Sequence, residues 1–95
     1  MKVAILMGSP RDDEKMAGAS EMLTRFGVEH EVHVMSAHRT PEEVAEFASN
    51  ARSNGFGVII CGAGMAAHLA GVVSAHTTIP VIGVPLSGGI SGGMD

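Results

Sequence analysis

Apolar and polar residues alternate in blocks along the chain, and these blocks predict four strands. Residues 3–7 and 57–61 are continuous apolar runs, which are typical of strands buried on both faces of a sheet. Residues 29–34 mix apolar and polar positions in alternation, as on a half-buried strand. A fourth short strand is predicted over residues 80–85. The pattern therefore places the strands at residues 3–7 and 57–61 in the interior of the sheet and gives the strand at residues 29–34 an exposed face.

Three helices are predicted between these strands because apolar residues recur there every three or four positions. Gly27 and Gly55 end the first two, since glycine readily takes the left-handed conformation at a helix C terminus. The third, from Ala66 to about His76, is apolar nearly all round, which predicts a buried helix, and Gly71 indicates close packing. The apolar faces of the first two helices are Met16, Ala19, Leu23 and Phe26, and Val44, Phe47, Ala48 and Ala51.

Strand and helix alternate along the chain, which predicts right-handed crossovers and a parallel sheet. The half-buried strand belongs at an edge and the apolar strands inside, which favours the strand order 2-1-3-4 of a flavodoxin-like, three-layer α/β/α fold. In that order the loops after the first and third strands face each other across a crevice, with the loop after the second strand beside them. At 95 residues the chain has room for one small domain.

Residues 36–41, with the sequence Ser-Ala-His-Arg-Thr-Pro, join the second strand to the second helix. Thr40 at the N-cap and Glu43 three residues later predict a capping box. His38 and Arg39 are then held at the carboxyl end of a strand, where open α/β sheets bind their ligands. The alternative is that the serine and threonine only shape the turn and that His38 and Arg39 are solvated. The local pattern does not decide between the two.

The neighbouring loops add groups that suit a phosphorylated ligand. Gly8-Ser9 offers backbone N–H groups and a hydroxyl at a helix N terminus, and Arg39, together with Arg11, adds guanidinium groups. Asp12 either caps the following helix or accepts hydrogen bonds from sugar hydroxyls, and neither role excludes the other. Histidine is the side chain suited to proton transfer near neutral pH, which assigns that role to His38. The residues alone thus predict a phosphorylated small-molecule site with a histidine acid–base.

The loop after the third strand and the remaining histidines are less specific. Gly62-Ala63-Gly64 lets a backbone approach a ligand closely but lacks the third glycine of a dinucleotide fingerprint. His68 either lines the crevice, which we favour, or is a core histidine. His30 and His33 point to opposite faces of their strand, and no carboxylate or cysteine cluster completes a metal site. We therefore expect no metal.

The composition of the chain indicates which kinds of partner and which cell compartment to expect. The formal charge of −4 argues against a nucleic-acid or anionic-membrane surface. No apolar stretch is long enough to span a membrane, and residues 3–7 are too few for a signal sequence. The single cysteine, Cys61, lies in a predicted buried strand and is interpreted as a small hydrophobic residue. A cytoplasmic protein is expected.

Four segments carry a specific combination of motifs along the whole chain: Met7-Gly8-Ser9 with Asp12, residues 34–41, residues 61–71 and residues 80–85. The most specific part is the pair Ser-Ala-His-Arg-Thr-Pro and Gly-Ala-Gly-Met-Ala-Ala-His-Leu. In this combination the sequence closely resembles the PurE, or AIR carboxylase, family of N5-carboxyaminoimidazole ribonucleotide mutases.

The resemblance implies conversion of N5-carboxyaminoimidazole ribonucleotide to 4-carboxy-5-aminoimidazole ribonucleotide in purine (IMP) biosynthesis, without a cofactor. The carbamate loses CO2 in a closed pocket, C4 of the aminoimidazole captures it, and His38 moves the proton. A small-molecule ribonucleotide substrate and a homo-octamer with sites at subunit contacts are also implied. The binding positions implied are Ser9, Asp12 and Arg39 for the nucleotide, and Ser36, Ala37, Gly62, Ala63, Gly64 and Leu69 along the pocket.

The sequence departs from the family pattern at three places. Arg11 replaces the second serine of Gly-Ser-x-Ser-Asp, where it either strengthens phosphate binding or crowds the turn. Met65 and Ala70 stand where the family has glycine and proline, and both are conservative. After Asp95 the family continues into a fifth strand and C-terminal helices, so residues 1–95 are expected to be a partial PurE-like domain, from a fragment or an early-terminated copy. We expect activity of the 95 residues by themselves to be doubtful.

Two other functions remain open at this stage. One is a carboxylase that adds CO2 directly to aminoimidazole ribonucleotide, although the two specific motifs favour the mutase. The other is a truncated, non-catalytic module that binds nucleotide or assembles with full-length subunits.

Overall fold

Four parallel strands form the centre of the molecule, in the order β2-β1-β3-β4. The computed structural model describes residues 1–64 and 68–86, so the predicted start of the third helix at Ala66 and the tail after Leu86 lie outside it. The elements are β1 (Lys2–Met7), the 3-10 helix η1 (Pro10–Asp12), α1 (Asp13–Arg25), β2 (His30–Val34), α2 (Pro41–Asn50), β3 (Phe56–Ala63), α3 (Leu69–His76) and β4 (Val81–Pro85).

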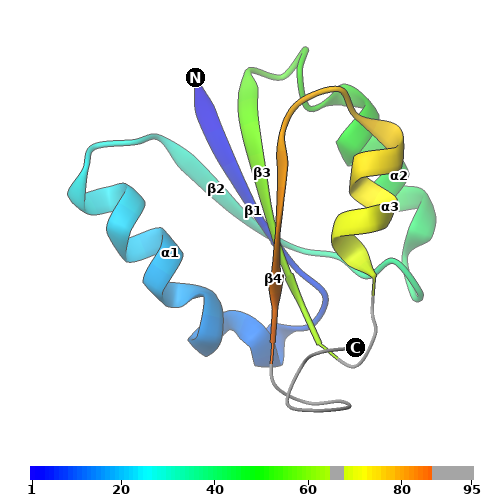
Figure 1. The fold of residues 1–95 in the computed structure, drawn as a ribbon, viewed down its shortest axis with the longest axis horizontal. Coiled ribbons are helices and arrows are strands. Elements are labelled where there is room, and N and C mark those ends of the chain that lie inside the picture. The colour runs from blue at the N-terminus through cyan, green and yellow to red at the C-terminus, as the bar shows by residue number, and fades with distance from the viewer. Residues whose placement is uncertain (65–67, 87–95) are drawn as a thin grey trace.

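The sheet confirms the strand order and the edge position predicted from the apolar pattern. Each neighbouring pair is parallel, and Ile5 of β1 is aligned with Val32 on one side and Ile60 on the other. Parallel neighbours need crossover connections, which the helices supply. Helix α1 covers one face of the sheet while α2 and α3 cover the other, giving the three-layer α/β/α arrangement (Figure 1).

Strand β1 is the most buried element of the described chain, because all five residues from Val3 to Met7 are buried. Successive side chains of a strand point to opposite faces. Accordingly Ala4 and Leu6 join a core built with residues of α2 and α3, whereas Ile5 and Met7 pack with Met16 of α1. One strand thereby ties both layers of helices to the sheet.

The two faces of the sheet are not equally covered. Only Met16 of α1 is buried, and Val32 and Ile82, which share the α1 face through their alignment with Ile5 and Ile60, are 43% and 52% exposed. Phe26, predicted on the buried face of the first helix, is 72% exposed, so that prediction is wrong. Phe26 is the C-cap, where the backbone leaves helical geometry, and its side chain no longer follows the helix face.

The helix ends follow the sequence in part. Gly27 directly follows the C-cap of α1 and has a φ of +69°, which confirms its predicted role as a left-handed terminating residue. Gly55 is also left-handed, with a φ of +92°, but the prediction that it ends the second helix is wrong, because α2 ends at Asn50 with Ala51 as its C-cap and a turn separates it from Gly55. The capping box predicted for Thr40 is wrong. Thr40 occupies the N-cap position of α2, but its side chain makes no capping hydrogen bond to the helix. Its hydroxyl is used inside the preceding turn instead, with Ser36.

Helix α3 is less buried than its composition predicts. Leu69 and Val73 are buried, but the final residues 74–76 are exposed. The close packing predicted at Gly71 is present, although its neighbour is not another element. A Cβ built on Gly71 would collide with the imidazole of His68, which folds back over the first turn of the helix.

We predict that Ile59→Ala destabilises the protein by about 2–5 kcal/mol, because it opens a cavity in the core beneath α2 and α3. Ile59 is fully buried in that core. Ile82→Ala is the matched control, since it makes the same chemical change on the adjacent strand at a half-exposed position, and should cost less than about 1 kcal/mol. Urea unfolding measures both. Equal losses would contradict the described packing.

We also predict that Glu31 stabilises the folded protein and that this stabilisation is lost in acid. Its carboxylate accepts hydrogen bonds from Lys2 Nζ at 2.8 Å and His33 Nε2 at 2.9 Å. These contacts lower the pKa of Glu31 below its ordinary value of 4.5, the Lys2 hydrogen bond contributing most. The stabilisation is therefore present above pH 4.5 and is lost as the pH falls through the folded-state pKa.

Glu31→Gln should lower the melting temperature slightly at pH 7, by less than Ile59→Ala, because the group is exposed. The difference from the wild type should shrink as the pH is lowered below 4.5. Glu29→Gln, at an exposed carboxylate just before β2, is the control and should change little. A difference that grew on acidification would refute the assignment.

Candidate functional site

A hollow of about 330 Å³ lies where the carboxyl ends of β1, β2 and β3 meet. Its walls are the turns that follow these strands, and Leu69 at the start of α3 completes it. This is the crevice that the strand order predicts. The residues along it are Gly8, Ser9, Arg11, Asp12, Ser36, Ala37, His38, Arg39, Ala63, Gly64 and Leu69.

The turn between β2 and α2 is fixed by its own side chains. Ser36 Oγ accepts hydrogen bonds from the backbone N–H groups of His38 at 3.2 Å and Arg39 at 3.1 Å. Thr40 Oγ1 accepts from Ser36 N at 2.8 Å, and its hydroxyl donates to Ser36 O at 3.2 Å. Ser36 and Thr40 therefore shape the turn, as one alternative from the sequence holds. His38 and Arg39 are exposed and line the hollow, and their functional role stays a prediction.

The turn after β1, where the sequence predicts a phosphate seat at Gly8-Ser9, is held by its own hydrogen bonds. Ser9 Oγ accepts from Arg11 N at 3.2 Å, and Ser9 O accepts from Asp12 N at 3.0 Å, so these backbone N–H groups are already used within the turn. Asp12 stands at the N-cap of α1 without a side-chain capping bond. Its carboxylate lies beside the hollow and is not used as a cap, which favours its reading as a ligand contact.

Two guanidinium groups border the hollow from opposite turns. Arg39 Nη2 donates to the Gly8 carbonyl at 3.4 Å and so reaches across from the β2 turn to the β1 turn. Arg11 is exposed and lines the hollow from the η1 side. With Asp12 and His38, the charged and titratable side chains here are two cations, one carboxylate and one imidazole. This set suits an anionic ligand that also carries hydroxyl groups.

Two of the residues predicted for the site lie outside the lining. Gly62 is buried, and a Cβ at this position would collide with Met16 Sδ, so α1 packing explains why glycine stands there. His68 is exposed, with a left-handed φ of 50°, next to residues that the structure does not describe. Functional roles for both stay predictions. Met65, Ala66 and Ala67 of the same motif lie outside the described residues.

Cys61 takes no part in the chemistry of the hollow. Its side chain is buried in β3, and desolvation raises the pKa of the thiol to about 12, so the thiolate is not available near neutral pH. Its interpretation as a small buried residue is confirmed. Within residues 1–64 and 68–86 no group of histidine, cysteine and acidic side chains is placed to hold a metal ion, and no helix has the length and hydropathy to cross a membrane.

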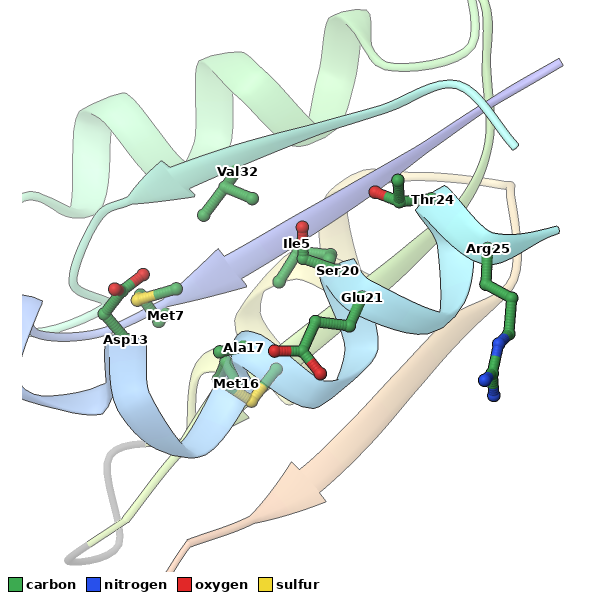
Figure 2. A pocket seen from close by; sticks show the side chains of 10 residues that line it. All are labelled: Ile5, Met7, Asp13, Met16, Ala17, Ser20, Glu21, Thr24, Arg25 and Val32. Carbon is green, nitrogen blue, oxygen red and sulfur yellow. The ribbon is translucent and has the colours of Figure 1, made fainter. Parts of the chain in front are cut away.

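A second and larger hollow, of about 570 Å³, lies between α1 and strands β1 and β2 (Figure 2). Its floor is apolar, formed by side chains such as Ile5, Met16 and Val32, and charged residues of α1 stand at its rim. Ser20 also lines it, and its hydroxyl is bonded to His30 Nε2 at 2.9 Å, which joins α1 to β2. This space reflects the incomplete cover of the α1 face, so the smaller hollow is the candidate site.

Comparison with known proteins agrees with the motifs at this site. The sequence profile of AIR carboxylase matches residues 2–95. The chain belongs to the AIR carboxylase family. It is 55% identical over 95 residues to an N5-carboxyaminoimidazole ribonucleotide mutase of Vibrio vulnificus, covering 100% of this chain and 59% of that protein. It is 54% identical over 93 residues to the mutase of Aquifex aeolicus, covering 98% and 56% of the two chains.

The solved structures agree with this family membership. The crystal structure of PurE from Treponema denticola superposes with a TM-score of 0.85 at 28% identity, covering 96% of this chain and 58% of that one. The chain thus spans about 59% of the length of the Vibrio relative that it matches. The flavodoxin-like arrangement predicted from the apolar pattern is the family's fold.

We predict that Ser36→Ala loosens the turn that carries His38 and Arg39. The change removes the acceptor of two backbone N–H groups, which should then exchange with solvent at least several-fold faster, at a cost of about 1 kcal/mol in stability. Amide hydrogen exchange measures the effect residue by residue. Ser53→Ala, which alters a turn after α2, is the control and should leave these two amides unchanged. Unchanged exchange in Ser36→Ala would contradict the assigned hydrogen bonds.

Proposed function

We propose that the chain carries the nucleotide site of an N5-carboxyaminoimidazole ribonucleotide mutase in purine biosynthesis. The carrying observation is that two separate connections line one hollow: Ser9 and Asp12 follow β1, and His38 and Arg39 follow β2. Two relatives that are 55% and 54% identical to this chain are N5-carboxyaminoimidazole ribonucleotide mutases, which supports this reaction. Because the chain spans only part of their length, the activity is proposed for the complete protein and tested on this chain.

In the proposed reaction the ribonucleotide is held by its phosphate and ribose. Arg39 and Ser9 contact the phosphate, and Asp12 accepts hydrogen bonds from the ribose hydroxyls. Ser36, Ala37, Ala63, Gly64 and Leu69 form the remaining lining. Gly62 and His68 stay predicted contacts on the resemblance alone. No cofactor takes part.

His38 carries the proton through both halves of the rearrangement. As an imidazolium it protonates the carbamate nitrogen while the N–C bond breaks and CO2 leaves. The aminoimidazole C4 then attacks CO2, and the neutral imidazole removes the proton from C4. One proton is given and one is taken back, so the reaction needs no external acid or base.

CO2 must remain close to C4 between these steps, and the described hollow is open at His38 and Arg39, which are both exposed. In this proposal a neighbouring subunit covers the hollow and closes it. The complete protein is proposed to be a homo-octamer in the cytoplasm. Residues 1–95 are in this proposal a single partial domain of that subunit. Exclusion of water then keeps CO2 from being lost.

We predict that His38→Asn lowers kcat by about 10²–10⁴-fold, the usual contribution of a general acid–base. Affinity for the ribonucleotide should stay within about threefold, because the phosphate and ribose contacts remain. His76→Asn changes an exposed histidine at the end of α3, away from the hollow, and should keep wild-type rates. A normal turnover rate in His38→Asn would remove it from the mechanism.

Supplying each substrate separately distinguishes the mutase from the two alternatives. The mutase converts N5-carboxyaminoimidazole ribonucleotide directly, whereas turnover only from aminoimidazole ribonucleotide and free CO2 would identify a carboxylase. Binding of the nucleotide with no turnover of either substrate would identify a non-catalytic module.

A further inference from the structure

We infer that Arg11 and Arg39 together form a two-guanidinium clamp that selects a dianionic phosphate monoester, so that Arg11 is a specificity-determining residue of this chain. This inference rests on the proposed function, because it assigns the phosphate end of the same hollow. It concerns the position at which the chain departs from the family pattern, where serine is usual.

The hydrogen bonds of the β1 turn remove two backbone N–H groups from an anion site there and so increase the part that side chains play in it. In a typical phosphate-binding turn, free backbone N–H groups point at the ligand. Here Ser9 accepts from the N–H groups of both Arg11 and Asp12. The side-chain donors that remain for an anion are the Ser9 hydroxyl, which can still donate its proton, and the two guanidinium groups.

The position of Arg11 suits this role and rules out the crowding that the sequence left open. Its side chain is exposed and lines the hollow, so it lies outside the tightly bonded part of the turn. In the described residues no carboxylate forms an ion pair with Arg11, since the salt bridges there join Glu31 to Lys2 and His33. Its charge therefore remains available to a ligand.

The second cation changes the charge that the hollow prefers. Arg39 alone is balanced by Asp12, whereas Arg11 adds one uncompensated positive charge. Guanidinium groups bind phosphate oxygens through paired hydrogen bonds, and two of them match the two negative charges of a phosphate monoester. A phosphate monoester gains its second charge with a pKa of about 6. Binding should therefore strengthen as the pH rises through that value.

The test is calorimetric titration of the wild-type chain with the product ribonucleotide and, separately, with its nucleoside. Arg11→Ser, which restores the usual serine, should weaken nucleotide binding about tenfold and leave nucleoside binding unchanged. It should also flatten the dependence of nucleotide affinity on salt and on pH between about 5 and 7. Arg11→Lys keeps the charge but loses the paired donors of the guanidinium group, so its nucleotide affinity should lie between those of the wild type and Arg11→Ser. Arg52→Ser removes an exposed arginine from the turn after α2 and is the matched control.

The outcomes separate this inference from the function on which it rests. Nucleotide binding that weakens in Arg39→Ala but is unchanged in Arg11→Ser would overturn the clamp and leave the proposed function standing. A wild-type chain that binds neither nucleotide nor nucleoside would overturn both. Equal weakening by Arg52→Ser would show a general charge effect and would also overturn the clamp.

Discussion

The pairing of β1 between β2 and β3 is the interaction on which the rest of the structure depends. Met7, the last residue of β1, is aligned with Val34 and with Gly62, so three strands end at nearly the same level. The ladder continues one residue further, since Met35 N donates to Met7 O at 2.9 Å. The turns that follow are therefore held side by side. A shift in this register would separate His38 from Ser9 before it altered either turn.

The same strand also explains why the two faces of the sheet behave differently. Alternate residues of β1 point into the core under α2 and α3 and into the smaller core under α1. The first core is closed by two helices, whereas the second is covered by one helix whose only buried residue is Met16. Met16 also packs close to the site, because it lies against the position of Gly62 near the end of β3. The packing of α1 thus constrains the strand whose next residues line the hollow.

The sequence was most informative where a single physical signal decides the outcome. The continuous apolar run at residues 3–7 predicts a central strand because burial on both faces leaves no polar position, and the alternation at residues 29–34 predicts an edge for the converse reason. With these two strands placed, the strand order and the meeting of the turns follow from chain connectivity. The place of the candidate site, at the carboxyl ends of the strands where these turns meet, could therefore be predicted from the sequence.

Predictions failed where several groups compete for one hydrogen bond. Thr40 has the residue type and position of a helix cap, yet Ser36 offers its hydroxyl both an N–H donor and a carbonyl acceptor nearby, and the capping bond is not made. In the turn after β1, Ser9 likewise accepts hydrogen bonds from the N–H groups of Arg11 and Asp12, which the sequence pattern does not indicate. The prediction for Phe26 fails for a different reason. Phe26 is the C-cap of α1, and a side chain at the end of a helix turns outward when the helix stops one residue earlier than expected. Such outcomes depend on coordinates within a turn, which periodicity does not contain.

The chemistry of the proposed reaction gives a reason for concentrating positive charge away from the reacting carbon. During the rearrangement the carboxyl group passes through neutral CO2, so no charged side chain can hold it at that moment. The phosphate is the one strong charge that the nucleotide keeps throughout. Binding through the phosphate therefore fixes the aminoimidazole while its carboxyl group is detached, and binding energy remote from the reacting bond maintains the alignment. In the proposed function the guanidinium groups bind the phosphate, which does not change during the reaction, and His38 acts on the part of the ligand that does.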